Sequence, residues 1–373
     1  MARFTVGFVF VVMFLNLLAV RDCGAEPTSK PADDAWPLYS KAAERVEEGY
    51  RAKIMSPTAS NLDYQNFPPF PPEWYKYEKE AYAFNAPARA LLREARSRSV
   101  AHWPVTGEGV DAKLPYLPRC RTLANEVADA AIYEHLQGND AAAIETVRDE
   151  LHLAELLDAR PSQWMVVSLV AVGIQMSALT RLEVITAEVS LTEDATDSKR
   201  LQVRVARELI RQLMDAGDPV KQYGELLERE TALGLNAQQK ERFLTTIRKA
   251  QMERHLAGMS LACHLFVREK SRWPASVAEL VAYLPAEPVD AWGKMGYAFV
   301  KLPSGADRPM VYSRCYSKDG LFYLTEGPVF GYYRGDGSSL PLKEQKEGGQ
   351  FRDVTVWAVP AVKPSPTTRA LKE

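Results

Sequence analysis

The strongest constraint on the fold is an apolar stripe at helical spacing between residues 238 and 270. Its members follow one another at intervals of four and three residues: Met252, Leu256, Met259, Cys263 and Phe266. Residues three and four apart share one face of an α-helix, so the pattern predicts a long helix with a buried side. Trp273-Pro274 follows and should end it, because proline cannot continue a helix.

Several earlier segments carry the same period. Residues 38–50 keep helical spacing, and residues 73–84 resume it after a proline-rich stretch at 67–72. We expect that stretch to be an extended connector, and the alternative is a polyproline ligand for an aromatic groove. Pro87 should restart the helix, with Asn85 as its cap.

Residues 123–157 predict a helical hairpin. Gly138-Asn139-Asp140 separates its two apolar stripes, because glycine and asparagine tolerate the left-handed conformation that ends a helix. The apolar segment at 165–185 contains polar interruptions such as Arg181, which a membrane span would have to bury in lipid. We therefore expect a core helix there.

The pattern changes near residue 250. Beyond it, segments rich in β-branched and aromatic residues alternate with turn residues and predict strands. These segments are 297–301, 310–316, 321–325 and 354–359. The expected fold class is mainly α: a helical-hairpin body over residues 36–245, then a small α+β domain over 246–360 in which the long helix packs on an antiparallel sheet. Residues 361–373 are expected to form a disordered tail.

The first 25 residues have the features of an export signal. Arg3 precedes an unbroken apolar run at 6–15, which is shorter than the ~20 residues of a spanning helix. Cys23-Gly24-Ala25 offers small residues for cleavage after Ala25, and residues 26–35 predict a flexible leader. The alternative is an uncleaved anchor. Either way, we expect the body to be exported to the periplasm or cell envelope.

Charge and composition argue against several classes of protein. The chain has 373 residues, and its 46 Lys+Arg against 48 Asp+Glu give a formal net charge of −2. This balance provides no bulk attraction to nucleic acid or an anionic membrane. A basic cluster predicts a solvated helix face, and a nucleic-acid patch is the alternative. Its members are Arg89, Arg93, Arg96 and Arg98.

The sequence predicts no metal site and no cofactor. His255 and His264 lie nine residues apart on the long helix, on roughly opposite faces, which does not suit zinc. Asp319, Asp336 and Asp353 lie in or beside loops between the predicted strands. A calcium site there is the alternative to plain turns.

After signal cleavage three cysteines remain, so the chain is not a disulfide scaffold. Cys263 belongs to the apolar stripe and is expected in the core. A disulfide to Cys315 and two buried thiols both remain open. Cys120 cannot be placed from the sequence.

No catalytic residue is identified. The chain contains neither a Gly-x-Ser-x-Gly turn nor a Gly-x-x-x-x-Gly-Lys loop. Glu78 and Glu80 fit an exposed helix face, as do Glu225, Glu228 and Glu230. The sequence therefore assigns no catalytic, cofactor-binding or metal-binding residue.

An ordered set of short motifs follows the long helix: Arg272-Trp273-Pro274-Ala275-Ser276, Glu279-Leu280, Leu284-Pro285, Asp290-Ala291-Trp292-Gly293 and Tyr297. In order and spacing they resemble the globular domain of type II secretion major pseudopilins, which implies a helix packed on a small antiparallel sheet. Ala291 stands where that family has proline. Ser317 replaces the first glycine of the loop that helps hold calcium in the family.

The mature chain also has Trp36-Pro37-Leu38-Tyr39, a helical middle and Arg352-Asp353-Val354-Thr355-Val356. Together these resemble a family of uncharacterised secreted proteins from planctomycete-type bacteria. We expect a non-catalytic envelope protein that acts as an interaction or structural module, with a protein or envelope polymer as partner. The expected contact surface is the aromatic-rich sheet with its loops at Asp319 and Asp336, and Tyr332 and Tyr333 are the residues to substitute there. The alternative is that the helical part covers the second face of this sheet. The alternatives are an envelope hydrolase built from scattered carboxylates and a calcium-stabilised binding module.

Overall fold

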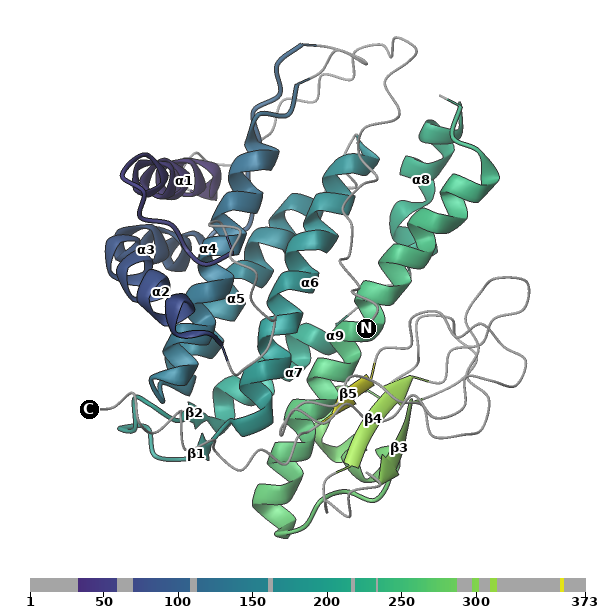
Figure 1. The fold of residues 1–373 in the computed structure, drawn as a ribbon. Coiled ribbons are helices and arrows are strands. Elements are labelled where there is room, and N and C mark those ends of the chain that lie inside the picture. The colour runs from purple at the N-terminus through teal and green to yellow at the C-terminus, as the bar shows by residue number, and fades with distance from the viewer. Residues whose placement is uncertain are drawn as a thin grey trace.

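The computed structural model describes residues 33–58, 70–107, 113–159, 164–215, 219–232 and 234–286, together with three strands at 297–301, 309–313 and 356–358. Over these residues the protein is mainly helical, as the sequence predicts (Figure 1). The helices are α1 (Trp36–Arg51), α2 (Pro72–Phe84), α3 (Ala86–Ala95), α4 (Tyr116–Leu136), α5 (Asp140–Asp158), α6 (Met165–Glu188), α7 (Val203–Met214), α8 (Pro219–Ala232), α9 (Ala237–Lys270) and the 3₁₀ helix η3 (Val277–Tyr283).

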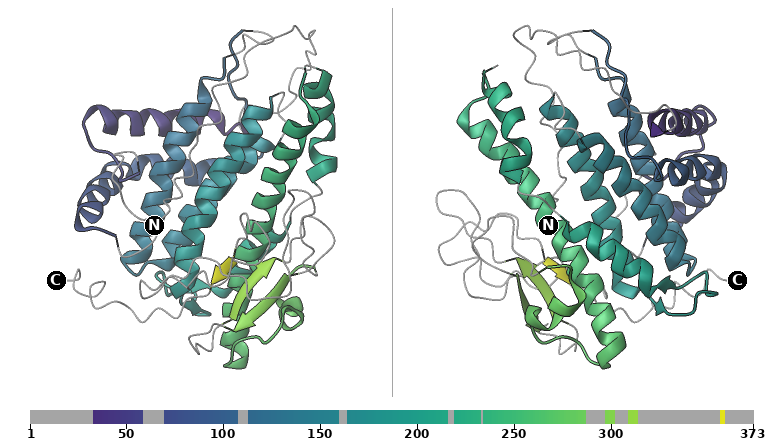
Figure 2. Two further views of the ribbon diagram at one scale, coloured as in Figure 1. Left: turned by 45° about the vertical axis from the view of Figure 1, so that its right-hand side comes forward. Right: turned by 180° about the vertical axis from the view of Figure 1, so that it is seen from behind.

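Helices α4, α5 and α6 form the centre of the body. Helix α5 packs between α4 and α6, and α6 also contacts α9. Helices α1, α2 and α3 lie on one flank of this layer, while α7, α8 and α9 lie on the other (Figure 2). The core runs through both flanks and includes large, fully buried rings at Tyr39, Trp74 and Tyr223.

The predicted hairpin and long helix are confirmed. Gly138 adopts a left-handed φ of 74° after α4, and the Asn139 side chain caps α5 by accepting from the Ala142 N–H. Helix α9 is 34 residues long. It starts with a capping box in which Asn236 and Gln239 satisfy each other's backbone N–H groups.

Helix α6 is confirmed as a helix of the body. Among the described helices it is the one long and apolar enough to cross a membrane by length and composition alone. Yet 56% of its most apolar window is buried within the protein, against α4, α5 and α9. A core helix of a bundle passes the same test of length and composition.

Three local predictions differ from the structure. The sequence predicts a loop at 191–196 and a helix from residue 199. Instead, β1 (Leu191–Thr192) and β2 (Leu201–Gln202) pair in parallel, so that α7 begins only at Val203. Leu201 of β2 is buried, and its packing in the core stabilises the pairing of these two short strands. Helix α8 contains Glu225 and Glu228, which are exposed on a helix as the sequence predicts.

The third difference concerns Asn85. Helix α3 restarts directly after this residue, as predicted, but the Asn85 side chain makes no capping hydrogen bond. It donates instead to the Glu126 carboxylate on α4. A buried carboxylate accepts a strong hydrogen bond, and this bond takes the place of the cap.

The end of the predicted leader is attached to the body. The Ala35 N–H donates to the Val100 carbonyl oxygen at 2.8 Å, and Asp33 accepts from both the N–H and the hydroxyl of Ser99. Asp34 forms a parallel bridge with Val100. The folded body therefore begins before Trp36.

Three described strands follow the helices. These are β3 (Tyr297–Lys301), β4 (Pro309–Ser313) and β5 (Val356–Ala358). They pair antiparallel in the order β3-β4-β5, and β4 and β5 lie beside α9 (Figure 1). All three fall within or overlap predicted strand segments. Other predicted features lie outside the described residues: the signal at 1–25, the strand at 321–325, the tail at 361–373, Cys315, Asp319, Asp336, Asp353, Tyr332 and Tyr333.

A matched pair of glycines tests the packing of α1. A Cβ placed on Gly49 would lie 2.8 Å from the backbone oxygen of Ile54, whereas one on Gly224 of α8 meets nothing within 4 Å. We expect Gly49→Ala to destabilise the protein by ~1–3 kcal/mol because the backbone must move. Gly224→Ala should stabilise it by up to ~1 kcal/mol through helix propensity. Urea unfolding of both variants measures these changes. Equal changes in the free energy of unfolding would contradict this packing of α1.

Candidate functional site

The alternative calcium ligands Asp319, Asp336 and Asp353 lie outside the described residues, and the sequence already argues against zinc at His255 and His264. His255 and His264 both lie on α9, and within the described ranges no group of three His, Cys, Asp or Glu side chains is placed to hold a metal ion. Cys263 is fully buried, which confirms its predicted core position. Burial raises the pKa of its thiol, and likewise that of Cys120.

A cluster of four carboxylates lies inside the helical body. Its members come from α2, α4 and α5, and each is 0% exposed: Glu78, Glu126, Asp129 and Glu150. We call them the buried carboxylate cluster. The sequence predicts an exposed face for Glu78, and this prediction is wrong. Glu80, two residues on, is exposed as expected.

Helical spacing explains why Glu78 points inward. It lies four residues after Trp74 and three before Ala81, and these three residues form the buried face of α2. Any side chain at that position must enter the contact between α2 and α4. The position of Glu78 relative to Trp74 is therefore the sequence signal that identifies this member of the cluster.

Two members have strong hydrogen-bond donors. The Asn85 amide donates to Glu126 Oε1 at 2.6 Å. Asp129 accepts from both the N–H and the hydroxyl of Thr58, at 2.8 and 2.9 Å, and its Oδ1 lies 3.3 Å from the Arg181 guanidinium. Asp129 thus has two hydrogen-bond donors and a cation as partners.

Glu78 is in a different situation. No hydrogen-bond donor among the described residues satisfies either of its carboxylate oxygens. Burial raises the pKa of Glu78 well above its ordinary value, and the negative neighbours Glu126 and Asp129 raise it further against the opposing effect of Arg89 and Arg181. A neutral acid is the form that such surroundings favour.

The pKa values of the other two glutamates are raised by the same cause. Burial raises the pKa of Glu126 to about 7, although the Asn85 hydrogen bond acts in the opposite direction. Burial raises the pKa of Glu150 to about 8, against the Ser177 hydroxyl and Arg181. Near neutral pH the cluster therefore holds protons that the same residues would release in water.

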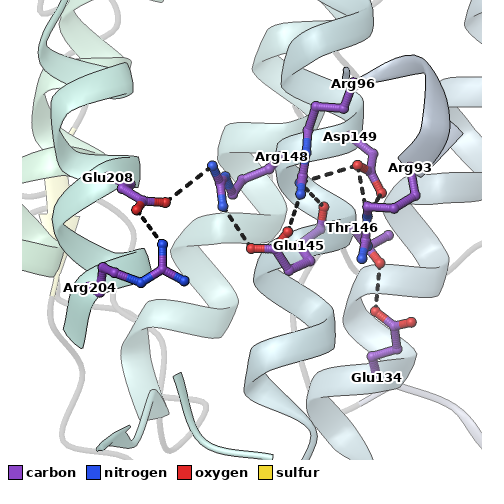
Figure 3. A network of polar contacts seen from close by, with 9 residues as sticks. All are labelled: Arg93, Arg96, Glu134, Glu145, Thr146, Arg148, Asp149, Arg204 and Glu208. Carbon is purple, nitrogen blue, oxygen red and sulfur yellow. Dashed lines mark hydrogen bonds and ion pairs between the residues drawn. The ribbon is translucent and has the colours of Figure 1, made fainter. Parts of the chain in front are cut away.

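A second polar network, partly buried, runs from α3 through α5 to α7, and Thr146 of α5 links it to Glu134 of α4 (Figure 3). Arg93 of α3 binds both carboxylate oxygens of Asp149 on α5, at 2.8 and 3.0 Å. Arg96 bridges Asp149 and Glu145. Arg148 continues the chain of ion pairs from Glu145 towards α7. The network fixes α3 and α7 against α5.

The predicted solvated face holds for Arg93, which is exposed although it pairs with a buried carboxylate, and is wrong for Arg96, which is half-buried. Helix α3 packs across α5, so that carboxylates more than 45 residues away meet these side chains. Arg89 lies over the Tyr82 ring, 3.7 Å from its centroid. Neither interaction could be predicted from the arginine spacing alone.

Compared with known proteins, the chain matches no family model, no curated protein sequence and no solved structure.

Proposed function

We propose that this protein is a non-catalytic exported protein of the cell envelope that acts as an interaction or structural module. The observation that carries the proposal is the complete burial of the buried carboxylate cluster. A general acid or base must come within hydrogen-bond reach of its substrate. With 0% exposure, these four carboxylates have the surroundings of structural groups.

Export is supported by the N-terminal pattern. Arg3, the apolar run at 6–15 and the small residues before Glu26 form the three regions of a secretory signal. The proposed mature chain begins at Glu26 and lies in the periplasm or envelope.

The second part supports the role of a module for assembly or binding. We propose that α9 and the antiparallel strands β3, β4 and β5 belong to an α+β domain like the head of a type II secretion major pseudopilin. The motifs from Arg272 to Tyr297 support this assignment. The apolar N-terminal run contains no glutamate of the kind found in a pilin assembly helix, so we propose contact with a partner protein or envelope polymer rather than polymerisation.

The proposed contact surface is tested by binding. A partner is first isolated with the full-length protein from the native envelope fraction and is then purified. We expect a double substitution, Tyr332→Ala with Tyr333→Ala, to weaken its binding at least ~30-fold, or ~2 kcal/mol. Tyr77→Ala, at an exposed ring on α2, is the control and should leave affinity unchanged.

Two results would contradict the proposal. Unchanged affinity in the double variant would place the contact elsewhere. Turnover in a panel of envelope hydrolase substrates that Glu150→Gln abolishes would establish an enzyme, since the variant removes a carboxyl group and preserves its shape.

A further inference from the structure

Helix α2 is attached to the body by a face that has a carboxyl group at its centre. At one end of this face the Trp74 ring stacks on Phe70, with centroids 4.5 Å apart. At the other end the Tyr82 hydroxyl donates to Glu134 of α4 at 2.9 Å. Between them Glu78 enters the contact with α4 without a hydrogen-bond donor.

Charged groups from every neighbouring element surround Glu78. Helix α3 contributes Arg89, and α6 contributes Arg181. Helix α4 contributes Glu126, Asp129 and the Tyr133 ring, whose hydroxyl is affected by the charge of Glu78. Glu150 of α5 is affected by the charges of Asp129 and Arg181, as Glu78 is. Ser56 and Thr58, from the segment after α1, lie against Glu126 and Asp129 respectively.

We propose that α2 is a pH-sensitive flap: it packs on α4 while Glu78 is protonated and is released when Glu78 loses its proton. The geometry supports α2 as the moving element. It lies at the edge of the helical body and packs chiefly on α4, with a smaller contact to α3 (Figure 2). Just before α2, the Phe70 ring stacks on Trp74.

The physical reason is the difference between the two protonation states in a dry site. Burying a neutral carboxyl group without hydrogen-bond partners has a small free-energy penalty, comparable to that of one unmade hydrogen bond. An ionised carboxylate in the same place has a much larger desolvation penalty, which is removed only if the group becomes hydrated again. Since Glu126 and Asp129 lie nearby, the ionised form of Glu78 is also repelled within the site. Moving α2 outward lets Glu78 be hydrated and removes both penalties.

Hydrogen exchange of the full-length protein tests this directly. Protection factors of the α2 amides, corrected for the intrinsic pH dependence of exchange, are measured at about pH 6 and about pH 9. We expect wild-type α2 to lose protection at the higher pH, by up to about tenfold for each pH unit by which the solution exceeds the pKa of Glu78. Amides of α9 should lose less.

Two variants on the same helix separate the flap from general alkaline loosening. Glu78→Gln cannot ionise and should keep α2 protected at both pH values. Glu80→Gln removes an exposed charge two residues away and should behave as wild type. The proposal is overturned if wild-type α2 keeps its protection, or if Glu78→Gln loses as much as wild type. Should Glu78→Gln fail to fold, the wild-type protein still provides the test: the proposal requires the α2 amides to lose more protection at about pH 9 than the α9 amides.

Discussion

The free energy of unfolding should decrease as the pH rises from about 5 to about 9, by at least ~3 kcal/mol. Burial raises the pKa of Glu126 to about 7 and that of Glu150 to about 8, from an ordinary value of 4.5. Between 4.5 and 8 the folded state thus holds more protons than the unfolded chain. Raising the pH then favours unfolding, which is the reverse of the trend for salt-bridged carboxylates.

Urea unfolding at a series of pH values measures this change. Carboxyl groups with lowered pKa values act in the opposite sense, but only in more acidic solution. Glu279, for example, has its pKa lowered to about 2 by hydrogen bonds from Arg272, so its contribution is lost below its ordinary value of 4.5. Burial also lowers the pKa of His152 from 6.5, and this group opposes the trend in the range just below 6.5. Stability should therefore be greatest in mildly acidic solution. A stability that is constant or increases towards alkaline pH would contradict the predicted burial of neutral acids.

The second large effect is expected from Arg181→Met. Arg181 is buried, and its guanidinium lies 3.3 Å from Asp129 Oδ1. Methionine fills similar space but leaves the buried carboxylate cluster without this cation. Removing one partner of a buried ion pair typically costs ~3–5 kcal/mol, because an uncompensated charge remains. We expect a loss of this size in urea unfolding at about pH 8.

The pH dependence of this variant distinguishes electrostatics from packing. At about pH 5 the cost should be smaller, because the neighbouring glutamates are then neutral. Arg204→Met is the control: its side chain is 72% exposed and pairs with Glu208, so it should cost at most ~1 kcal/mol. Equal costs of Arg181→Met at both pH values would show that ionisation of the neighbouring glutamates does not contribute, and would contradict this interpretation of the cluster.

The elements that could be predicted from sequence are those whose signal is local and repeated. Helix α9 has a stripe of four-three spacing from Met252 to Phe266, and the hairpin has a turn that its own residues determine. By contrast, β1 and β2 are two residues each. Their pairing depends on where Leu201 is buried, and no local pattern contains that information.

For a different reason, the buried position of Glu78 and the partners of Arg93 and Arg96 could not be predicted. Charged side chains are almost never fully buried, and this general rule favours an exposed Glu78. The position of Glu78 between Trp74 and Ala81 carries the contrary signal, which is correct here. The partners of Arg93 and Arg96 lie on α5, far along the chain. Only the crossing of α3 over α5 brings them together.

The protonation state of the buried glutamates is the central claim, and a carbon-13 NMR titration of the glutamate side chains measures it most directly. Glu78→Gln, Glu126→Gln and Glu150→Gln assign the three signals. We predict midpoints near 7 for Glu126 and near 8 for Glu150, with Glu78 also far above 4.5. Midpoints at or below 4.5 for all three would show ionised carboxylates in the folded protein at neutral pH, and would contradict both the stability profile and the proposed flap.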